Sequence, residues 1–212
     1  MIYWVLLVIT ALFAYLFGSL DTMVLASNFV FRRNLRRLGN SSVWLSNFRR
    51  LYGIGGFAKL LAVEIVKDLI PIVLGSVLLG IKGHADAGRA FAGLVVVMGS
   101  LWPLFSGLRG NHAPVAYVVA CLATESSVGI AAAVIMLLVT ALTRYVALGT
   151  VAGVLVSLLV VVLVIDDALI LRLMLITAGL VILRQIPCVI RILRRREPRL
   201  GFEEDITYKL DE

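Results

Sequence analysis

The chain has 212 residues, of which 61% are hydrophobic and 16% are charged, and its mean hydropathy is +1.02. Soluble domains are roughly half apolar and about a quarter charged, so this composition excludes a soluble globular protein and indicates an integral membrane protein. The net charge of +7 does not indicate nucleic-acid binding, because the sequence has no compact soluble module and no basic strand interleaved with aromatic residues.

Seven apolar segments follow one another along the chain, and we expect each to form a helix. They are Ile2–Leu20, Ile54–Ile81, Ala90–Phe105, Ala113–Ala123, Val128–Leu142, Val146–Ile165 and Ala168–Ile186. A transmembrane helix needs about 20 apolar residues, with about 17 as the usual minimum. The segment from Ala113 is therefore the weakest, and it either re-enters the membrane or continues through Thr124 to Ser127. The first segment lacks a basic region before it and a cleavage site after it, so we expect a retained span rather than a signal peptide. The sequence predicts an all-α, polytopic membrane helix bundle of about seven transmembrane helices.

The positions of the basic residues predict the orientation of this bundle. With seven spans, the odd-numbered connections and the C-terminal tail share one side, and they hold 16 of the 20 lysines and arginines. Basic residues collect in cytoplasmic loops, so we expect the N-terminus outside and the tail in the cytoplasm. No long linker or internal repeat divides the chain. We therefore expect one integral membrane domain over residues 1–212, with the helix bundle in 1–186 and a basic cytoplasmic tail in 187–212. Anionic membrane lipids explain most of the remaining positive charge.

The first cytoplasmic connection contains an unusual polar stretch, RRLGNSSVWLSNFRR, which runs from Arg36 to Arg50. Arginine presents a planar fork of donors that matches phosphate oxygens, and Ser, Asn and Gly-rich backbone supply the further donors that an oxyanion needs. One interpretation is therefore a phosphate site at the headgroup layer. The alternative is a plain amphipathic connector in which Trp44 is an interfacial anchor.

The order of the other motifs favours the phosphate site. Gly18-Ser19 closes the first segment, Gly39 to Asn47 is followed by Arg50 and Gly53, and Glu64-x-x-Lys67 lies in the second segment. Further along stand Gly99, Trp102-Pro103, Arg109-Gly110, Arg144-Tyr145-Val146-x-Leu148 and Glu197-Pro198-Arg199-Leu200-Gly201. This ordered set, which spans nearly the whole chain, resembles the bacterial acyl-phosphate-dependent glycerol-3-phosphate acyltransferases.

The resemblance implies transfer of a fatty acyl group from acyl phosphate to the sn-1 hydroxyl of glycerol 3-phosphate, to give lysophosphatidate for phospholipid synthesis. It implies a multi-pass protein of the bacterial inner membrane with its active face toward the cytoplasm and without a cofactor or metal. Matching the motifs by position gives a catalytic set and a set that binds substrate or phosphate. The catalytic candidates are Ser41, Asn40 and His112. The binding candidates are Ser42, Ser46, Asn47, Arg50, Lys67, Arg109, Gly110, Arg144 and Gln185.

Several positions depart from the family pattern. The family's Ser-Gly-Asn falls on Asn40, Ser41 and Ser42, so the expected hydroxyl is displaced by one residue and Ser41 is its natural substitute. The family's Gly-Gly-Lys-Gly becomes Gly110, Asn111, His112 and Ala113, which exchanges a permanent cation for a titratable one.

Further departures lie near the end of the chain. The family's His and Asn, three residues apart, fall on Gln185 and Cys188, and its Ser after the fifth span falls on Ala147. Two interpretations follow. Either acyl transfer persists, with Ser41 orienting the acceptor and the donor's phosphate taking its proton, or the fold is kept as a binder of lipid or phosphate ligands without turnover.

The charged residues inside the second segment allow a third class of function. Glu64, Lys67 and Asp68 lie about one turn apart, and charges inside a span are costly and commonly functional. They form either a structural ion pair, a substrate contact or part of a small transporter. The absence of repeat symmetry and of paired broken helices argues against the transporter.

Overall fold

A computed structural model of the protein describes residues 2–20, 22, 44–106 and 113–194, with the backbone alone for 44–52, 54 and 106. Within these ranges the chain forms seven long α-helices, one 3-10 turn (η4) and no strand, so the all-α prediction is confirmed for them. The elements are α1 Ile2–Gly18, α3 Trp44–Gly80, α4 Ala85–Leu101, η4 Leu104–Ser106, α5 Pro114–Thr124, α6 Ser126–Thr143, α7 Val146–Val164 and α8 Ala168–Leu193.

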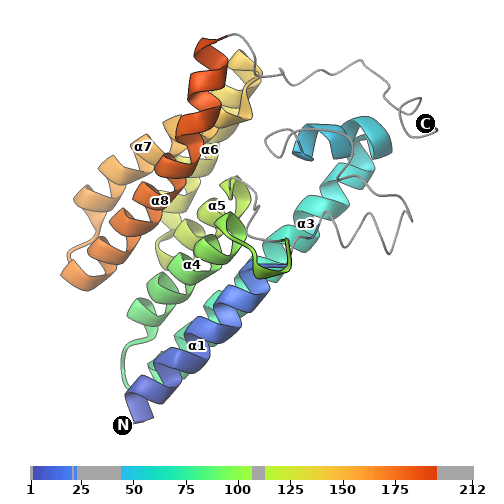
Figure 1. Ribbon diagram of the computed structural model, residues 1–212. Helices are drawn as coiled ribbons and strands as arrows, with labels where there is room; N and C mark the ends of the chain where they lie inside the picture. The colour runs from blue at the N-terminus through green and yellow to red at the C-terminus, as the bar shows by residue number, and fades with distance from the viewer. Residues whose placement is uncertain (1, 21, 23–43, 107–112, 195–212) are drawn as a thin grey trace.

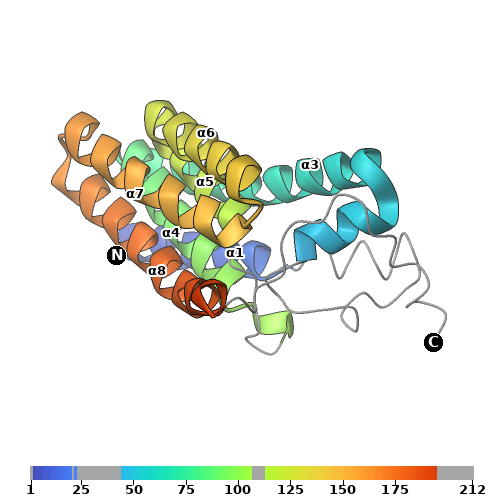
Figure 2. The ribbon, with the colours of Figure 1, turned by 90° about the horizontal axis from the view of Figure 1, so that it is seen from above.

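The helices run alternately up and down, and α4 lies at their centre. It contacts α1, α3, α5 and α8, whereas α6 packs mainly against α7 and α5. Seen from above, α3 lies on one flank and the α7–α8 pair on the other (Figure 2). A central helix must pack on several sides, and α4 accordingly buries most of its last two turns.

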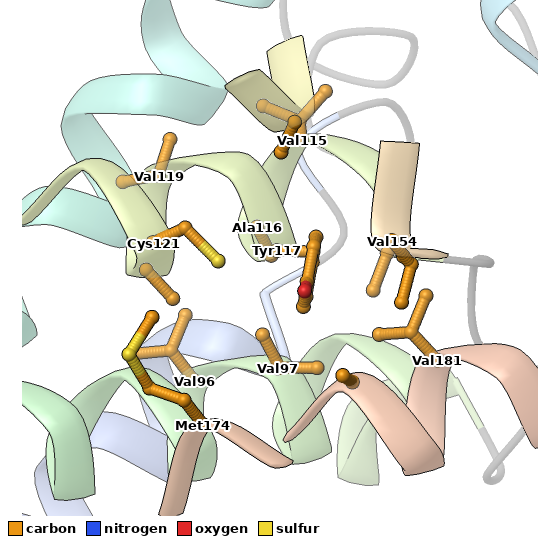
Figure 3. Packing of buried hydrophobic residues seen from close by; sticks show 14 of the residues in the cluster. Val96, Val97, Val115, Ala116, Tyr117, Val119, Cys121, Val154, Met174 and Val181 are labelled. Atoms are coloured by element: carbon orange, nitrogen blue, oxygen red, sulfur yellow. The ribbon is translucent and has the colours of Figure 1, made fainter. Parts of the chain in front are cut away.

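The core lies where α4, α5, α7 and α8 meet. Figure 3 shows Val96 and Val97 of α4 facing Tyr117 of α5, with Val154 of α7 and Val181 of α8 closing the cluster. All five are less than 4% exposed, so their burial is a major source of stability between these helices.

Glycine allows α1 and α4 to approach closely. A Cβ atom on Gly99 of α4 would lie 2.6 Å from the carbonyl oxygen of Tyr15 and 2.9 Å from the amide nitrogen of Ser19. Both of these atoms belong to the backbone and cannot rotate away. The end of α1 therefore lies directly against α4, as small residues permit in membrane helices.

The outer face of the bundle is apolar. Large hydrophobic side chains such as Leu142, Leu159 and Leu163 are more than two thirds exposed, which suits contact with lipid rather than water. By length and composition, three of the described helices can cross a membrane, namely α6, α7 and α8. The chain is therefore a membrane protein, while the number of crossings and the side of each terminus stay predictions.

The weakest predicted segment forms α5, which has only 11 residues. At 1.5 Å per residue it is about 17 Å long, well short of the roughly 30 Å of hydrocarbon. It does not continue to Ser127, because Glu125 adopts an extended backbone (φ −145°, ψ 114°). The Glu125 side chain then accepts a hydrogen bond from Ser127 N and begins α6.

Other helix boundaries differ from the apolar runs too, among them the start of α4, the start of α3 and the end of α8, which continues to Leu193 rather than Ile186. α4 begins at Ala85 rather than Ala90, because Asp86 and Arg89 form an ion pair one turn apart and extend the helix beyond its apolar part. α3 begins at Trp44, and it changes direction at Gly53 (φ 67°, ψ −173°), a conformation that favours glycine. Figures 1 and 2 show the part before Gly53 leaving the axis of the rest of the helix.

Candidate functional site

Several helix ends face the same end of the bundle, toward the top and right of Figure 1. They are the last turns of α1, α4, α6 and α8 and the first turns of α3, α5 and α7, and consecutive helices reach this end because they alternate in direction. The chain leaves α1 here for residues 21–43 and leaves α4 here for residues 102–113. The two connections that carry most of the predicted site therefore start from neighbouring helix ends.

Half of the predicted site residues lie in parts of the chain that the structure does not describe. Asn40, Ser41, Ser42, Arg109, Gly110 and His112 are outside the described residues, as is Asn111. For Ser46, Asn47 and Arg50 the backbone alone is placed, in the first part of α3. The roles of all these residues stay predictions, and Lys67, Arg144 and Gln185 are the predicted residues whose side chains the structure describes.

Lys67 of α3 lies at the centre of a buried polar cluster. Its Nζ atom donates to the carbonyl oxygen of Leu20 at 3.0 Å and to Glu64 Oε1 at 3.0 Å, and it lies 3.3 Å from Asp68 Oδ1. Lys67, Glu64 and Asp68 are 9%, 6% and 0% exposed. Neither oxygen of Asp68 accepts a well-formed hydrogen bond within the described parts of the chain, so its ion pair with Lys67 is its one polar contact there.

This cluster lies beside the C-terminal end of α1. α1 ends at Gly18, and Leu20, whose carbonyl group accepts from Lys67, lies two residues beyond that end. A cation at such an end is favoured by the helix dipole. Of the three interpretations of these charges, the geometry favours the structural ion pair, because Lys67 links α3 to the end of α1.

A second set of bonds joins the end of α1 to α4. The Tyr15 hydroxyl donates to the carbonyl oxygen of Trp102 at 2.7 Å, and Ser100 Oγ donates to the carbonyl oxygen of Gly18 at 3.2 Å. Trp102 directly follows α4, so the Tyr15 bond holds the start of the connection that carries Arg109, Gly110 and His112. Sequence reasoning missed Tyr15 and Ser100, since one tyrosine or serine in an apolar run carries no positional signal.

Gln185 of α8 is buried, and two further polar side chains follow it along the helix. Gln185 is 1% exposed, and its Oε1 atom has no hydrogen-bond donor among the residues that the structure describes. Cys188 follows one turn later and is fully buried, and Arg191 Nη2 donates to its Sγ atom at 3.1 Å. Gln185, Cys188 and Arg191 thus follow one stripe of the helix toward the end of the bundle where the other helix ends meet.

Arg144 occupies the sharp turn between α6 and α7. Its backbone is left-handed (φ 61°, ψ 18°), and its N–H donates to the carbonyl oxygen of Thr140, which closes α6. Its side chain is exposed at the same end of the bundle as α8's last turn. Lys67, beside the end of α1, and Gln185, in α8, are buried, whereas Arg144 lies at the surface in the turn between α6 and α7. Within the described ranges, no group of three or more His, Cys, Asp or Glu residues could hold a metal ion.

Comparison with known proteins identifies the family. A model of the family described as glycerol-3-phosphate acyltransferase matches residues 8–195, which is nearly the whole bundle. The chain belongs to the glycerol-3-phosphate acyltransferase family. The family suggested by the motif order is therefore confirmed.

Relatives in this family are similar along most of the chain. A glycerol-3-phosphate acyltransferase of Thermoanaerobacter pseudethanolicus is 28% identical over 199 residues, which covers 94% of this chain and 98% of the relative. One from Synechococcus elongatus is 29% identical over 196 residues and covers 90% and 93%.

The fold is also that of a solved family member. The crystal structure of PlsY, an integral membrane glycerol 3-phosphate acyltransferase, in its glycerol 3-phosphate form has a TM-score of 0.79 and 23% identity, and the match covers 92% of this chain and 96% of PlsY. Its lysophosphatidic acid form has a TM-score of 0.77. The arrangement of helices in this chain is therefore that of an integral membrane protein of this family.

Proposed function

We propose that this protein transfers a fatty acyl group from acyl phosphate to glycerol 3-phosphate and so makes lysophosphatidate for phospholipid synthesis. The family match over residues 8–195 carries this proposal. The relatives bear the name glycerol-3-phosphate acyltransferase, and PlsY has been crystallised in glycerol 3-phosphate and lysophosphatidic acid forms.

The reaction requires little covalent chemistry from the protein. Acyl phosphate is an activated mixed anhydride, so the sn-1 hydroxyl of glycerol 3-phosphate can attack its carbonyl carbon directly. One carbon–oxygen bond forms to the glycerol, the bond to the phosphate oxygen breaks, and the released phosphate takes the hydroxyl proton. The protein then has to hold two phosphates and orient one hydroxyl.

The predicted residues fit these tasks by type. Ser41, with Asn40 and His112, would orient the acceptor hydroxyl, and Arg50, Arg109 and Arg144 would hold phosphate. The bundle end described above suits such a site, because the connections with Ser41 and Arg109 and the turn with Arg144 all belong to it. Its excess of basic residues supports a cytoplasmic active face in the bacterial inner membrane. The acyl chain would remain in the lipid.

Acyl transfer by the purified protein tests the proposal. The protein in lipid vesicles should release phosphate from palmitoyl phosphate only when glycerol 3-phosphate is present, and mass spectrometry should detect lysophosphatidate in equal amount. Ser41→Ala and Arg50→Ala should each suppress both products, while Ser126→Ala, at the opposite end of α6, should not. Phosphate release that does not depend on glycerol 3-phosphate would contradict the proposal.

One observation favours a second candidate function. Gln185 and Cys188, at the positions of the family's His and Asn, are both buried against neighbouring helices. A protein that had lost these polar groups could keep the phosphate-binding arginines and bind substrate without turnover. Binding of glycerol 3-phosphate or palmitoyl phosphate by calorimetry, without product from the wild type, would identify such a binder.

A further inference from the structure

The two connections that carry the predicted site residues begin close together, at a small group of bonded residues around the end of α1. We call this group, Tyr15, Leu20, Lys67 and Trp102 with Glu64 and Asp68, the junction. Lys67 holds the carbonyl group of Leu20, which lies just after α1 at the start of the connection that carries Ser41. Tyr15 holds the carbonyl group of Trp102, at the start of the connection that carries Arg109 and His112. We propose that Lys67 and Tyr15 are positioning residues for acyl transfer, which fix these two starting points relative to each other. This inference rests on the proposed function.

Three protein oxygens surround the Lys67 ammonium, which matches its three donors. The oxygens of Leu20, Glu64 and Asp68 lie 3.0, 3.0 and 3.3 Å from Nζ, and the side chain is 9% exposed. Two of its N–H groups donate to Leu20 and Glu64, and the ammonium also pairs with the Asp68 carboxylate, whose negative charge opposes a substrate phosphate beside it. The sequence prediction grouped Lys67 with the phosphate-binding residues, and the geometry instead favours an indirect role through the end of α1.

The hydrogen bond of Tyr15, like those of Lys67, joins one donor to one specific acceptor. Tyr15 lies in the last turn of α1, and its hydroxyl reaches across to a backbone carbonyl group 87 residues later. The two helices touch at this level, because Gly99 of α4 packs on the Tyr15 carbonyl and on Ser19, and Ser100 holds the carbonyl group of Gly18. A shift of the α1 end would therefore move the start of one connection toward or away from the other.

Stability alone does not explain well why Glu64, Lys67 and Asp68, the charged residues of the junction, are present. The three side chains carry a net charge of −1, and buried ion groups contribute no more stability than apolar residues of the same size in many proteins. Buried charges with directional bonds do, however, define one geometry where apolar contacts allow several. A defined geometry matters where substrate groups must be placed, since misplacement of about 1 Å can reduce a rate by about 100-fold.

Four variants in lipid vesicles test the inference. Tyr15→Phe removes one hydroxyl, and a neutral triple variant, Glu64→Gln/Lys67→Met/Asp68→Asn, removes the charges without leaving one of them unpaired. Lys67→Arg keeps a cation. Tyr117→Phe removes a buried hydroxyl, which pairs with Ser157 at 2.6 Å between α5 and α7, and is the matched control.

Positioning predicts a kinetic effect that does not follow thermal stability. Tyr15→Phe and the triple variant should each lower kcat/KM for glycerol 3-phosphate by about five- to tenfold, the equivalent of one hydrogen bond. Lys67→Arg, which keeps the cation, should show most of the wild-type kcat/KM. The control should lower the melting temperature with kcat/KM within twofold of wild type. Wild-type kinetics in both Tyr15→Phe and the triple variant would overturn the inference, and so would an equal loss in the control.

Hydrogen exchange provides a readout that does not need the reaction. Peptides covering residues 15–20 and 98–106 should exchange faster by about five- to tenfold in Tyr15→Phe than in the wild type, whereas the control should leave them unchanged. Unchanged exchange in Tyr15→Phe would overturn the inference even if acyl transfer is present. If the wild type transfers no acyl group but these peptides respond as expected, the proposed function fails while the junction stands.

Discussion

The hydroxyl of Tyr117 donates a 2.6 Å hydrogen bond to Ser157 Oγ and so links α5 to α7 inside the bundle. The direction of this bond follows from the neighbouring one, because Ser157 uses its own hydrogen to donate to the carbonyl oxygen of Val154 at 2.7 Å. Both side chains are buried.

This direction predicts an asymmetry between two substitutions. Tyr117→Phe should lower the free energy of unfolding by about 1 kcal/mol, because one bond is lost while Ser157 still donates to Val154. Ser157→Ala should cost more, about 2 kcal/mol, because it leaves the Tyr117 hydroxyl buried without its acceptor. Urea or thermal unfolding in detergent measures both, and the double variant should resemble Tyr117→Phe. Equal effects of the two single changes would contradict the assigned donor.

Close packing of α1 on α4 predicts that Gly99 tolerates no side chain. Gly99→Ala should lower the free energy of unfolding by about 1–3 kcal/mol, since the new methyl group would meet backbone atoms of Tyr15 and Ser19 that cannot move aside. Gly179→Ala in α8 is the control, because nothing lies within 4 Å of its Cβ position. It should leave stability unchanged or raise it by up to about 1 kcal/mol through helix propensity. The melting temperature should therefore fall in Gly99→Ala and stay unchanged or rise in Gly179→Ala.

The buried charges of α3 predict a rescue experiment. Lys67→Met alone should lower the free energy of unfolding by about 3–5 kcal/mol, because Glu64 and Asp68 then remain buried without their cation. Addition of Glu64→Gln and Asp68→Asn should restore most of this loss. The destabilisation by Lys67→Met should persist at high salt, because salt screens buried charge pairs only weakly. Chemical unfolding at low and high salt measures this. A triple variant as unstable as Lys67→Met would show that the net charge is not the cause.

The departures of α8 from the family pattern, at Gln185 and Cys188, predict that activity rises when the family's residues are restored. Gln185→His/Cys188→Asn restores the pair that the family resemblance places here, and it should raise kcat/KM for acyl transfer by about tenfold or more if an imidazole assists the acceptor hydroxyl. Such an imidazole acts in its neutral form, so the gain should be present above its pKa and disappear as the pH falls through about 6.5. A pH profile of initial rates measures this. Gln185→Asn/Cys188→Ser, which adds no titratable group, should show no such acidic limb.

Most of the helices could be predicted from the sequence, because uninterrupted apolar runs leave few alternatives to helical spans. The boundaries were less accurate where polar residues belong to a helix. Asp86 and Arg89 precede the apolar run and yet lie in the first two turns of α4, and Glu125 separates α5 from α6 although no Gly or Pro marks the break.

The site could be predicted only in outline. Of the predicted side chains that the structure describes, Lys67 and Gln185 are buried and Arg144 is exposed, and the cytoplasmic surface inferred from the charge distribution stays a prediction. The Lys67 bond to Leu20 and the Tyr15 bond to Trp102 could not be foreseen, because each joins residues far apart in the sequence and depends on how the helices pack. The predicted convergence of arginines over one phosphate pocket stays a prediction, since Arg50 and Arg109 lie outside the described side chains.

The unequal lengths of the helices have a consequence for the surrounding lipid. α8 has 26 residues and is about 39 Å long, while α1 and α4, with 17 residues each, are only about 26 Å long. Such hydrophobic mismatch is relieved by tilting the long helix or by thinning the bilayer beside the short ones. The thickness of the bilayer would therefore influence how far Arg191, in the last turn of α8, extends toward the headgroups.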